Sequence, residues 1–119
     1  MTSLRSGVRI KKMEENYLEV SREVLRTLTP RESRILKLRE ELNDIDEKIL
    51  KLLEERMDIV REVGHIKSEL DIPIEDKARE KEIIDRLSEH AGKRLTENQL
   101  IRIFRAVFKS SKLEQKKLD

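Results

Sequence analysis

Residues 35–70 read ILKLREELNDIDEKILKLLEERMDIVREVGHIKSEL, and this stretch decides the fold of the chain. Its apolar side chains recur at alternating steps of three and four residues, which is the heptad spacing of a helix that packs along another helix. The stripe consists of Ile35, Leu38, Leu42, Ile45, Ile49, Leu52, Arg56, Ile59, Val63, Ile66 and Leu70. The pattern predicts one long helix and raises the question why Arg56 occupies a position that calls for an apolar residue.

Local signals predict where this helix begins and ends. Thr29 and Glu32 have the spacing of a capping box, and Pro30 between them suits the first helical position. Pro73 lacks a backbone donor and predicts the end of the helix near Leu70. A helix of this length spans about 60 Å. The rest of a 119-residue chain is too short to cover it, so we expect it to pair with a second copy.

Two shorter helices are predicted after the long one. The first runs from about Asp76 to Ala91, and Gly92 suits the position just past its end. The second opens with a capping box of Thr96 and Gln99 and runs to about Lys117. Their inward positions are Ile83, Ile84, Leu87 and Ala91 in the first, and Leu100, Phe104, Val107, Ser111 and Gln115 in the second. No strand pattern occurs, so the predicted fold class is all-α.

Residues 1–34 are predicted to form a separate N-terminal extension that is partly helical. Within it, residues 13–28 place Tyr17, Val20, Val24 and Leu28 on one helical face. We expect this helix to fold back on the body of the chain or on the partner subunit and to be dispensable for chemistry, because every candidate site residue follows position 38.

Composition narrows the class of protein. The chain is 44% charged and 36% hydrophobic, which is typical of long helices and coiled coils. It contains no cysteine and two histidines, so neither a disulfide nor a metal site is expected. No apolar run approaches the ~20 residues of a membrane helix, and the N-terminus lacks an apolar signal region. These features predict a cytoplasmic protein.

Several polar residues occupy inward phases of the predicted helices. Arg56 and Lys67 lie eleven residues apart and nearly on one face. The other inward polar residues are Ser111, Gln115, Asp76, Arg79 and Glu80, of which the last three share a face. Each has an ordinary explanation: an arginine can pair with an acidic neighbour, Ser111 and Gln115 can fray, and Asp76 can be an N-cap. Together, inward cations without matching anions indicate an anionic ligand.

Arg39 adds a geometric argument. It precedes Arg56 by 17 residues, which is about 25 Å along a helix. One small ligand therefore cannot contact both arginines of the same chain. In an antiparallel pair of long helices, Arg39 of one copy could approach Arg56 of the other, which predicts a site shared between two chains.

These residues carry a resemblance to a known family. The stretches LREELNDIDEKILKLLEERMDIVREVGHIK (38–67) and IPIEDKAREKEIIDRL (72–87) resemble the all-helical chorismate mutase family, and the likeness extends over about residues 35–118. It implies a chorismate mutase domain over 35–119: a three-helix chain in an intertwined homodimer with two active sites. It also implies conversion of chorismate to prephenate, on the route to phenylalanine and tyrosine, without a cofactor.

The resemblance assigns a role to each candidate. The reaction is an intramolecular Claisen rearrangement, which needs neither a nucleophile nor proton transfer. Arg56 and Arg39 of the partner subunit would clamp the substrate carboxylates, while Lys67 and Gln115 would donate to the ether oxygen. The resemblance further implies that Glu80 would accept a hydrogen bond from the ring hydroxyl of the substrate. Asp76 and Arg79 would orient that end of the substrate, and Ser111 would help to bind a carboxylate.

Three other functions fit parts of the sequence. A coiled-coil interaction module would explain the heptads but has no need for the inward polar set. A nucleic-acid binder would explain the basic residues 1–34 and the stretch LTPRESRIL (28–36), yet no aromatic residues interleave and the capping box explains that stretch more simply. An isochorismate pyruvate lyase shares the anion-lined helical pocket, and the full set of eight residues favours the mutase.

Overall fold

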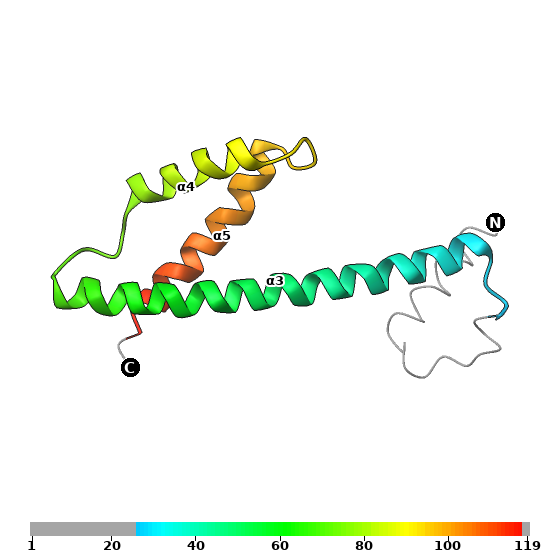
Figure 1. Cartoon of the computed structure of the whole chain (residues 1–119), viewed down its shortest axis with the longest axis horizontal. Helices are drawn as coiled ribbons and strands as arrows, with labels where there is room; N and C mark the ends of the chain where they lie inside the picture. The colour runs from blue at the N-terminus through cyan, green and yellow to red at the C-terminus, as the bar shows by residue number, and fades with distance from the viewer. Residues whose placement is uncertain (1–25, 118–119) are drawn as a thin grey trace. The chain divides into compact units, whose positions relative to one another are not determined.

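The structure is a computed structural model that describes residues 26–117. They form three helices, α3 (Pro30–Glu69), α4 (Lys77–His90) and α5 (Glu97–Gln115), and contain no strand (Figure 1). The prediction of an all-α fold is therefore confirmed. The helix expected over 13–28 lies outside the described residues except for its last three positions, 26–28. The chain comprises two compact parts, one up to Leu50 and one from Lys51 onward.

The first turn of α3 is closed by the predicted capping box. The backbone N–H of Glu32 donates to Thr29 Oγ1 at 3.2 Å, and the backbone N–H of Thr29 donates to Glu32 Oε1 at 3.3 Å. Each side chain thereby satisfies a backbone donor that has no partner within the helix. Pro30 is the first helical residue, as its fixed φ angle favours.

The end of α3 is set by a left-handed residue rather than by proline. Asp71 has a φ of 54°. The backbone N–H of Ile72 donates to Lys67 O at 2.8 Å, and that of Asp71 to Ser68 O at 3.4 Å. These bonds form the Schellman arrangement that satisfies the last helical carbonyls. The sequence analysis assigned the stop to Pro73, which lies two residues beyond the cap that ends the helix.

The shorter helices begin at the predicted caps. Asp76 accepts from the backbone N–H of Arg79 at 2.9 Å, and Thr96 and Gln99 form a complete capping box. At the end of α4, Ala91 is extended with a φ of −66°, and Gly92 has no positive φ. Gly92 thus follows the C-cap, as expected, but the chain leaves α4 through the extended Ala91 and not through a left-handed glycine.

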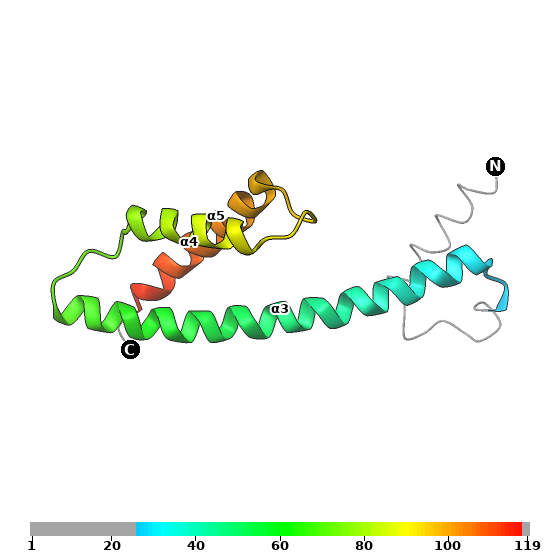
Figure 2. The same ribbon diagram turned by 45° about the horizontal axis from the view of Figure 1, so that its top comes forward.

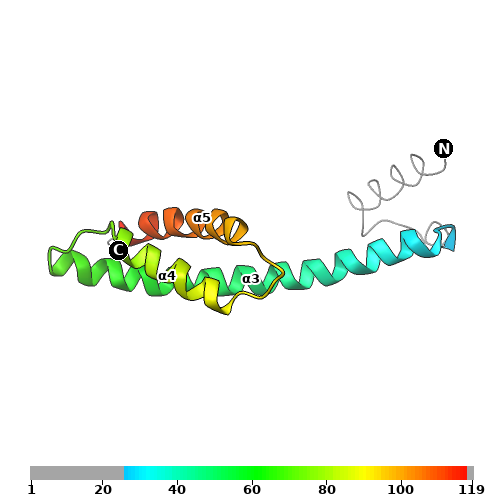
Figure 3. The ribbon, with the colours of Figure 1, turned by 90° about the horizontal axis from the view of Figure 1, so that it is seen from above.

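In the part from Lys51 onward, α4 and α5 both lie over the same face of α3 (Figures 2 and 3). The buried apolar residues are Ile83, Leu100 and Phe108. Phe104 packs on Phe108 with ring centroids 5.9 Å apart. Two residues differ from their predicted burial. Ala91 is exposed, because the chain turns away from the helix there. Phe108 is more deeply buried than Val107, because the inward face of α5 passes from Phe104 to Phe108, a step of four residues and not three.

The apolar stripe of α3 remains exposed in the single chain. Its ten apolar members, from Ile35 to Leu70, have exposed fractions of 38% to 64%. Single exposed leucines are ordinary on a protein surface, but a continuous stripe of this length marks an interaction surface.

Candidate active site

One cavity of about 290 Å³ lies within the part of the chain that follows Leu50. It is formed by α3, the loop after it, α4 and α5, and it contains seven of the eight candidate residues from the sequence. These are Arg56, Lys67, Asp76, Arg79, Glu80, Ser111 and Gln115. Arg39 lies on α3 before Leu50 and is not among the residues that line the cavity.

The remaining wall of the cavity is mostly apolar. It is made by Ile59, Val60, Val63, Ile74, Ile83 and Phe108. The sequence analysis did not assign these residues to the site, because apolar residues at helical spacing are indistinguishable from ordinary core. An apolar wall with a few converging polar groups is the usual construction of a small-molecule site.

Arg56 is held on the cavity wall by neutral partners. Its Nη1 donates to Ser111 Oγ, and its guanidinium lies 6.0 Å from the centre of the Phe108 ring. No carboxylate among residues 26–117 pairs with it, so the ordinary explanation of a register-fixing ion pair does not apply here. Burial lowers the pKa of Arg56, and the positive charge of Arg79 lowers it further. Arginine stays protonated nevertheless, so the site carries uncompensated positive charge.

Ser111 is a buried part of α5 and not a frayed end. Its side chain belongs to a residue that is 5% exposed, and its hydroxyl donates to Val107 O at 2.7 Å. Because the hydroxyl proton is used in this way, the oxygen is left to accept from Arg56. Ser111 therefore fixes the direction of the arginine side chain.

Lys67 and Gln115 meet across the cavity. Lys67 Nζ donates to Ile74 O and to Gln115 Oε1, both at 3.4 Å. No ion pair joins Lys67 to a carboxylate in the described part of the chain. Since the Gln115 oxygen faces the ammonium, its amide N–H groups remain able to donate to a ligand.

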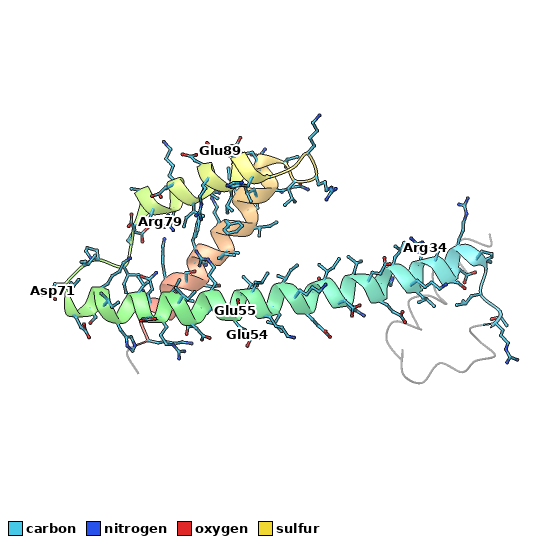
Figure 4. The ribbon with its side chains drawn as sticks, viewed as in Figure 1. Arg34, Glu54, Glu55, Asp71, Arg79 and Glu89 are labelled. Carbon is cyan, nitrogen blue, oxygen red and sulfur yellow. The ribbon has the colours of Figure 1, made fainter. Side chains whose placement is uncertain are left out.

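Asp76, Arg79 and Glu80 bring charge to the first turn of α4. Asp76 is the N-cap of α4, which was one of the two roles considered for it, and it also lines the cavity. Arg79, labelled in Figure 4, pairs with Glu82 at 3.0 Å on the exposed side of the helix. Such an exposed pair contributes little to stability, so the arginine can exchange it for a ligand.

Lys112 is a cavity residue that the sequence analysis missed. Its Nζ lies 3.0 Å from Glu75 Oε1 and 3.2 Å from Glu80 Oε2. The hydrogen bond to Glu75 raises the pKa of Lys112, and the Glu80 carboxylate raises it further. A signal was present in the sequence: Lys112 follows Phe108 by four residues and so shares its face.

The lining contains four cations, Arg56, Lys67, Arg79 and Lys112, and two carboxylates, Asp76 and Glu80. Arg79 and Lys112 also pair with Glu82 and Glu75, which lie outside the lining. Two of the cations, Arg56 and Lys67, form no ion pair with a carboxylate of residues 26–117.

Gly64 lets the end of α5 approach α3 closely. A Cβ atom on Gly64 would lie 2.7 Å from Gln115 Cα and 2.9 Å from its carbonyl carbon, closer than such atoms approach. The same turn of α5 is anchored by Arg61, whose Nε donates to Glu114 Oε1 at 2.9 Å. His65 Nε2 lies 3.1 Å from Lys117 O. The position of Gln115 thus depends on backbone contact with α3.

Among the described residues, no group of three or more His, Asp or Glu side chains is arranged to hold a metal ion. None of the helices in the described range is both long and apolar enough to cross a membrane.

Comparisons with known proteins agree on one family. The family model for chorismate mutase type II matches residues 38–116. A chorismate mutase of Methanocaldococcus jannaschii is 38% identical over 84 residues, which cover 70% of this chain and 85% of that protein. The solved structure of chorismate mutase (form II) from Thermus thermophilus matches with a TM-score of 0.67 and 33% identity, over 71% of this chain and 97% of that one. The chain therefore belongs to the chorismate mutase family, the isomerases that convert chorismate to prephenate in aromatic amino acid biosynthesis.

Proposed function

We propose that the cavity beside Arg56 and Lys67 is the active site in which this chain rearranges chorismate to prephenate. One observation carries the proposal: two cations line the same cavity, and neither pairs with a carboxylate of the described residues. Burying unpaired charge is unfavourable unless a ligand compensates it. A dicarboxylate substrate supplies that compensation.

Positioning is the first contribution to catalysis. Arg56, directed by Ser111, binds one carboxylate through charge-assisted hydrogen bonds. Arg39 of the partner subunit binds the other, and the two arginines hold the substrate in the compact conformer in which the new bond can form. Restricting a flexible substrate to a reactive conformer lowers the barrier because the entropy is lost on binding rather than in the reaction.

Electrostatic stabilisation is the second contribution. As the ether C–O bond breaks, negative charge develops on the oxygen. Lys67 and the amide N–H of Gln115 donate to that oxygen, and their mutual hydrogen bond keeps both donors on one side of the cavity. The apolar wall keeps water away, which strengthens both interactions.

The first turn of α4 recognises the ring hydroxyl. Glu80 accepts a hydrogen bond from it, while Asp76 and Arg79 orient this corner of the substrate. Their shared placement at the start of α4 supports these roles, because the N-cap bond of Asp76 to the Arg79 backbone holds the turn in one conformation.

A homodimer with two shared sites completes the proposal. It is supported by the exposed apolar stripe of α3 and by the separation of 17 residues between Arg39 and Arg56 in the sequence. An antiparallel partner would cover the stripe and bring its Arg39 to the cavity. A cytoplasmic location is likewise proposed from the sequence alone.

Conversion of chorismate by the purified chain tests the function. Chorismate is expected to disappear with equimolar formation of prephenate, without added metal or cofactor. Isochorismate is the matched control, because a pyruvate lyase would release pyruvate from it. Pyruvate release without prephenate formation would show that the chain acts as a pyruvate lyase and not as a mutase.

Gly64→Ala is expected to lower kcat/KM at least tenfold. Alanine favours a helix over glycine by about 1 kcal/mol, so helix propensity alone predicts a stabilised protein. The added methyl group instead meets the Gln115 backbone and displaces that donor. Gly92→Ala is the matched control, because nothing lies within 4 Å of its Cβ position. Equal activity of the two variants would show that the close contact is unimportant.

A further inference from the structure

The Glu80 carboxylate depends on Lys112. Glu80 Oε2 is buried and forms no hydrogen bond with the described residues, and its ion pair among them is with Lys112 Nζ at 3.2 Å. The same ammonium donates to Oε1 of Glu75 at 3.0 Å, and Glu75 lies in the loop before α4. Lys112 therefore connects α5 to two carboxylates at the N-terminal end of α4. It also lines the cavity.

We propose that Lys112 is a positioning residue that holds Glu80 in place to accept the substrate hydroxyl. The inference rests on the role proposed above for Glu80. Lys112 engages Oε2 and leaves Oε1 for the hydroxyl. A carboxylate whose second oxygen is fixed in this way loses less freedom when the substrate binds.

Lys112 also keeps Glu80 away from the substrate clamps. The other charged residues that line the cavity are Arg56 and Lys67 on α3, and Asp76 and Arg79 at the start of α4. Without Lys112, Glu80 would be drawn to the unpaired Arg56 or Lys67 and would compete with the substrate carboxylates. Glu75, which does not line the cavity, pairs with the same ammonium from the solvent side.

Three variants separate the two salt bridges. Lys112→Met, which keeps the length of the side chain without its charge, is expected to lower kcat/KM about tenfold. Lys112→Arg, which restores the cation, is expected to stay within about threefold of the wild type. Glu75→Gln is the matched control: it breaks the bridge on the other side of the same ammonium and is expected to change kcat/KM less than about twofold. Circular dichroism and dimer content are compared for all of them.

A double-mutant cycle shows whether Lys112 acts through Glu80. In a Glu80→Gln background, Lys112→Met is expected to cause less than about a further twofold loss. A merely structural role would instead give the same tenfold loss in both backgrounds, and that result would overturn the proposal. So would full activity of Lys112→Met, or a loss in Glu75→Gln as large as in Lys112→Met.

The failure of the underlying assignment has a different signature. Full activity of Glu80→Gln would remove the hydroxyl-accepting role of Glu80 and, with it, the reason for positioning it. A large loss in Glu80→Gln with none in Lys112→Met would leave that role intact and reject Lys112 alone. If Lys112→Met loses helicity, Lys112→Gln takes its place in the cycle.

Discussion

Lys67→Ala is expected to lower kcat/KM by at least two orders of magnitude. The ammonium of Lys67 is proposed to meet the negative charge that develops on the ether oxygen, and removal of one such donor costs about 3 kcal/mol in comparable sites. The loss appears mainly in kcat, because the donor acts more strongly on the transition state than on the bound substrate. Single-turnover measurements of chorismate conversion separate this effect from product release.

The fold of the Lys67 variant is expected to survive. Lys67 forms no ion pair within the described residues, and its two hydrogen bonds are long at 3.4 Å. Lys81→Ala is the matched control, since Lys81 is an exposed lysine of α4 that does not line the cavity. Near-full activity of Lys67→Ala in a correctly folded protein would remove Lys67 from the catalytic site.

Arg39→Ala and Arg56→Ala are each expected to be nearly inactive, and their mixture is expected to regain activity. Under the shared-site proposal each active site takes Arg56 from one chain and Arg39 from the other. In a dimer of the two variants, one site carries both defects and the other carries neither. A random mixture contains about half such dimers, each with one intact site of two, so recovery approaches about one quarter of the wild type.

The complementation needs proof that mixed dimers form. The two chains carry tags of different size and are refolded together, and the mixture is assayed before the doubly tagged dimer is isolated. The isolated mixed dimer, with one intact site of two, is expected to reach about one half of the wild type. Refolding each variant alone is the control, because it retains two identical defective sites. Mixed dimers as inactive as their parents would reject the shared site, since a site within one chain stays broken in every combination.

Local structure could be read from the sequence because its causes are local. The capping boxes at Thr29 and Thr96 each satisfy backbone donors within three residues, so their spacing alone predicts the helix starts. The heptad stripe is equally local, since a period of three and four residues places side chains on one face of any helix. The end of α3 was less predictable: Asp71 adopts a left-handed conformation that favours glycine, and no sequence rule marks it.

Helical periodicity identified seven polar residues of the cavity from the amino-acid sequence. The contacts of these residues could not be predicted, because they are made between helices. Ser111 directs Arg56 from 55 residues away, and Lys112 on α5 pairs with Glu80 on α4. Gly64 is a further example, because glycine is required there by the close approach of the Gln115 backbone from another helix. Periodicity reports the face of a helix, whereas distances between faces depend on how the helices pack.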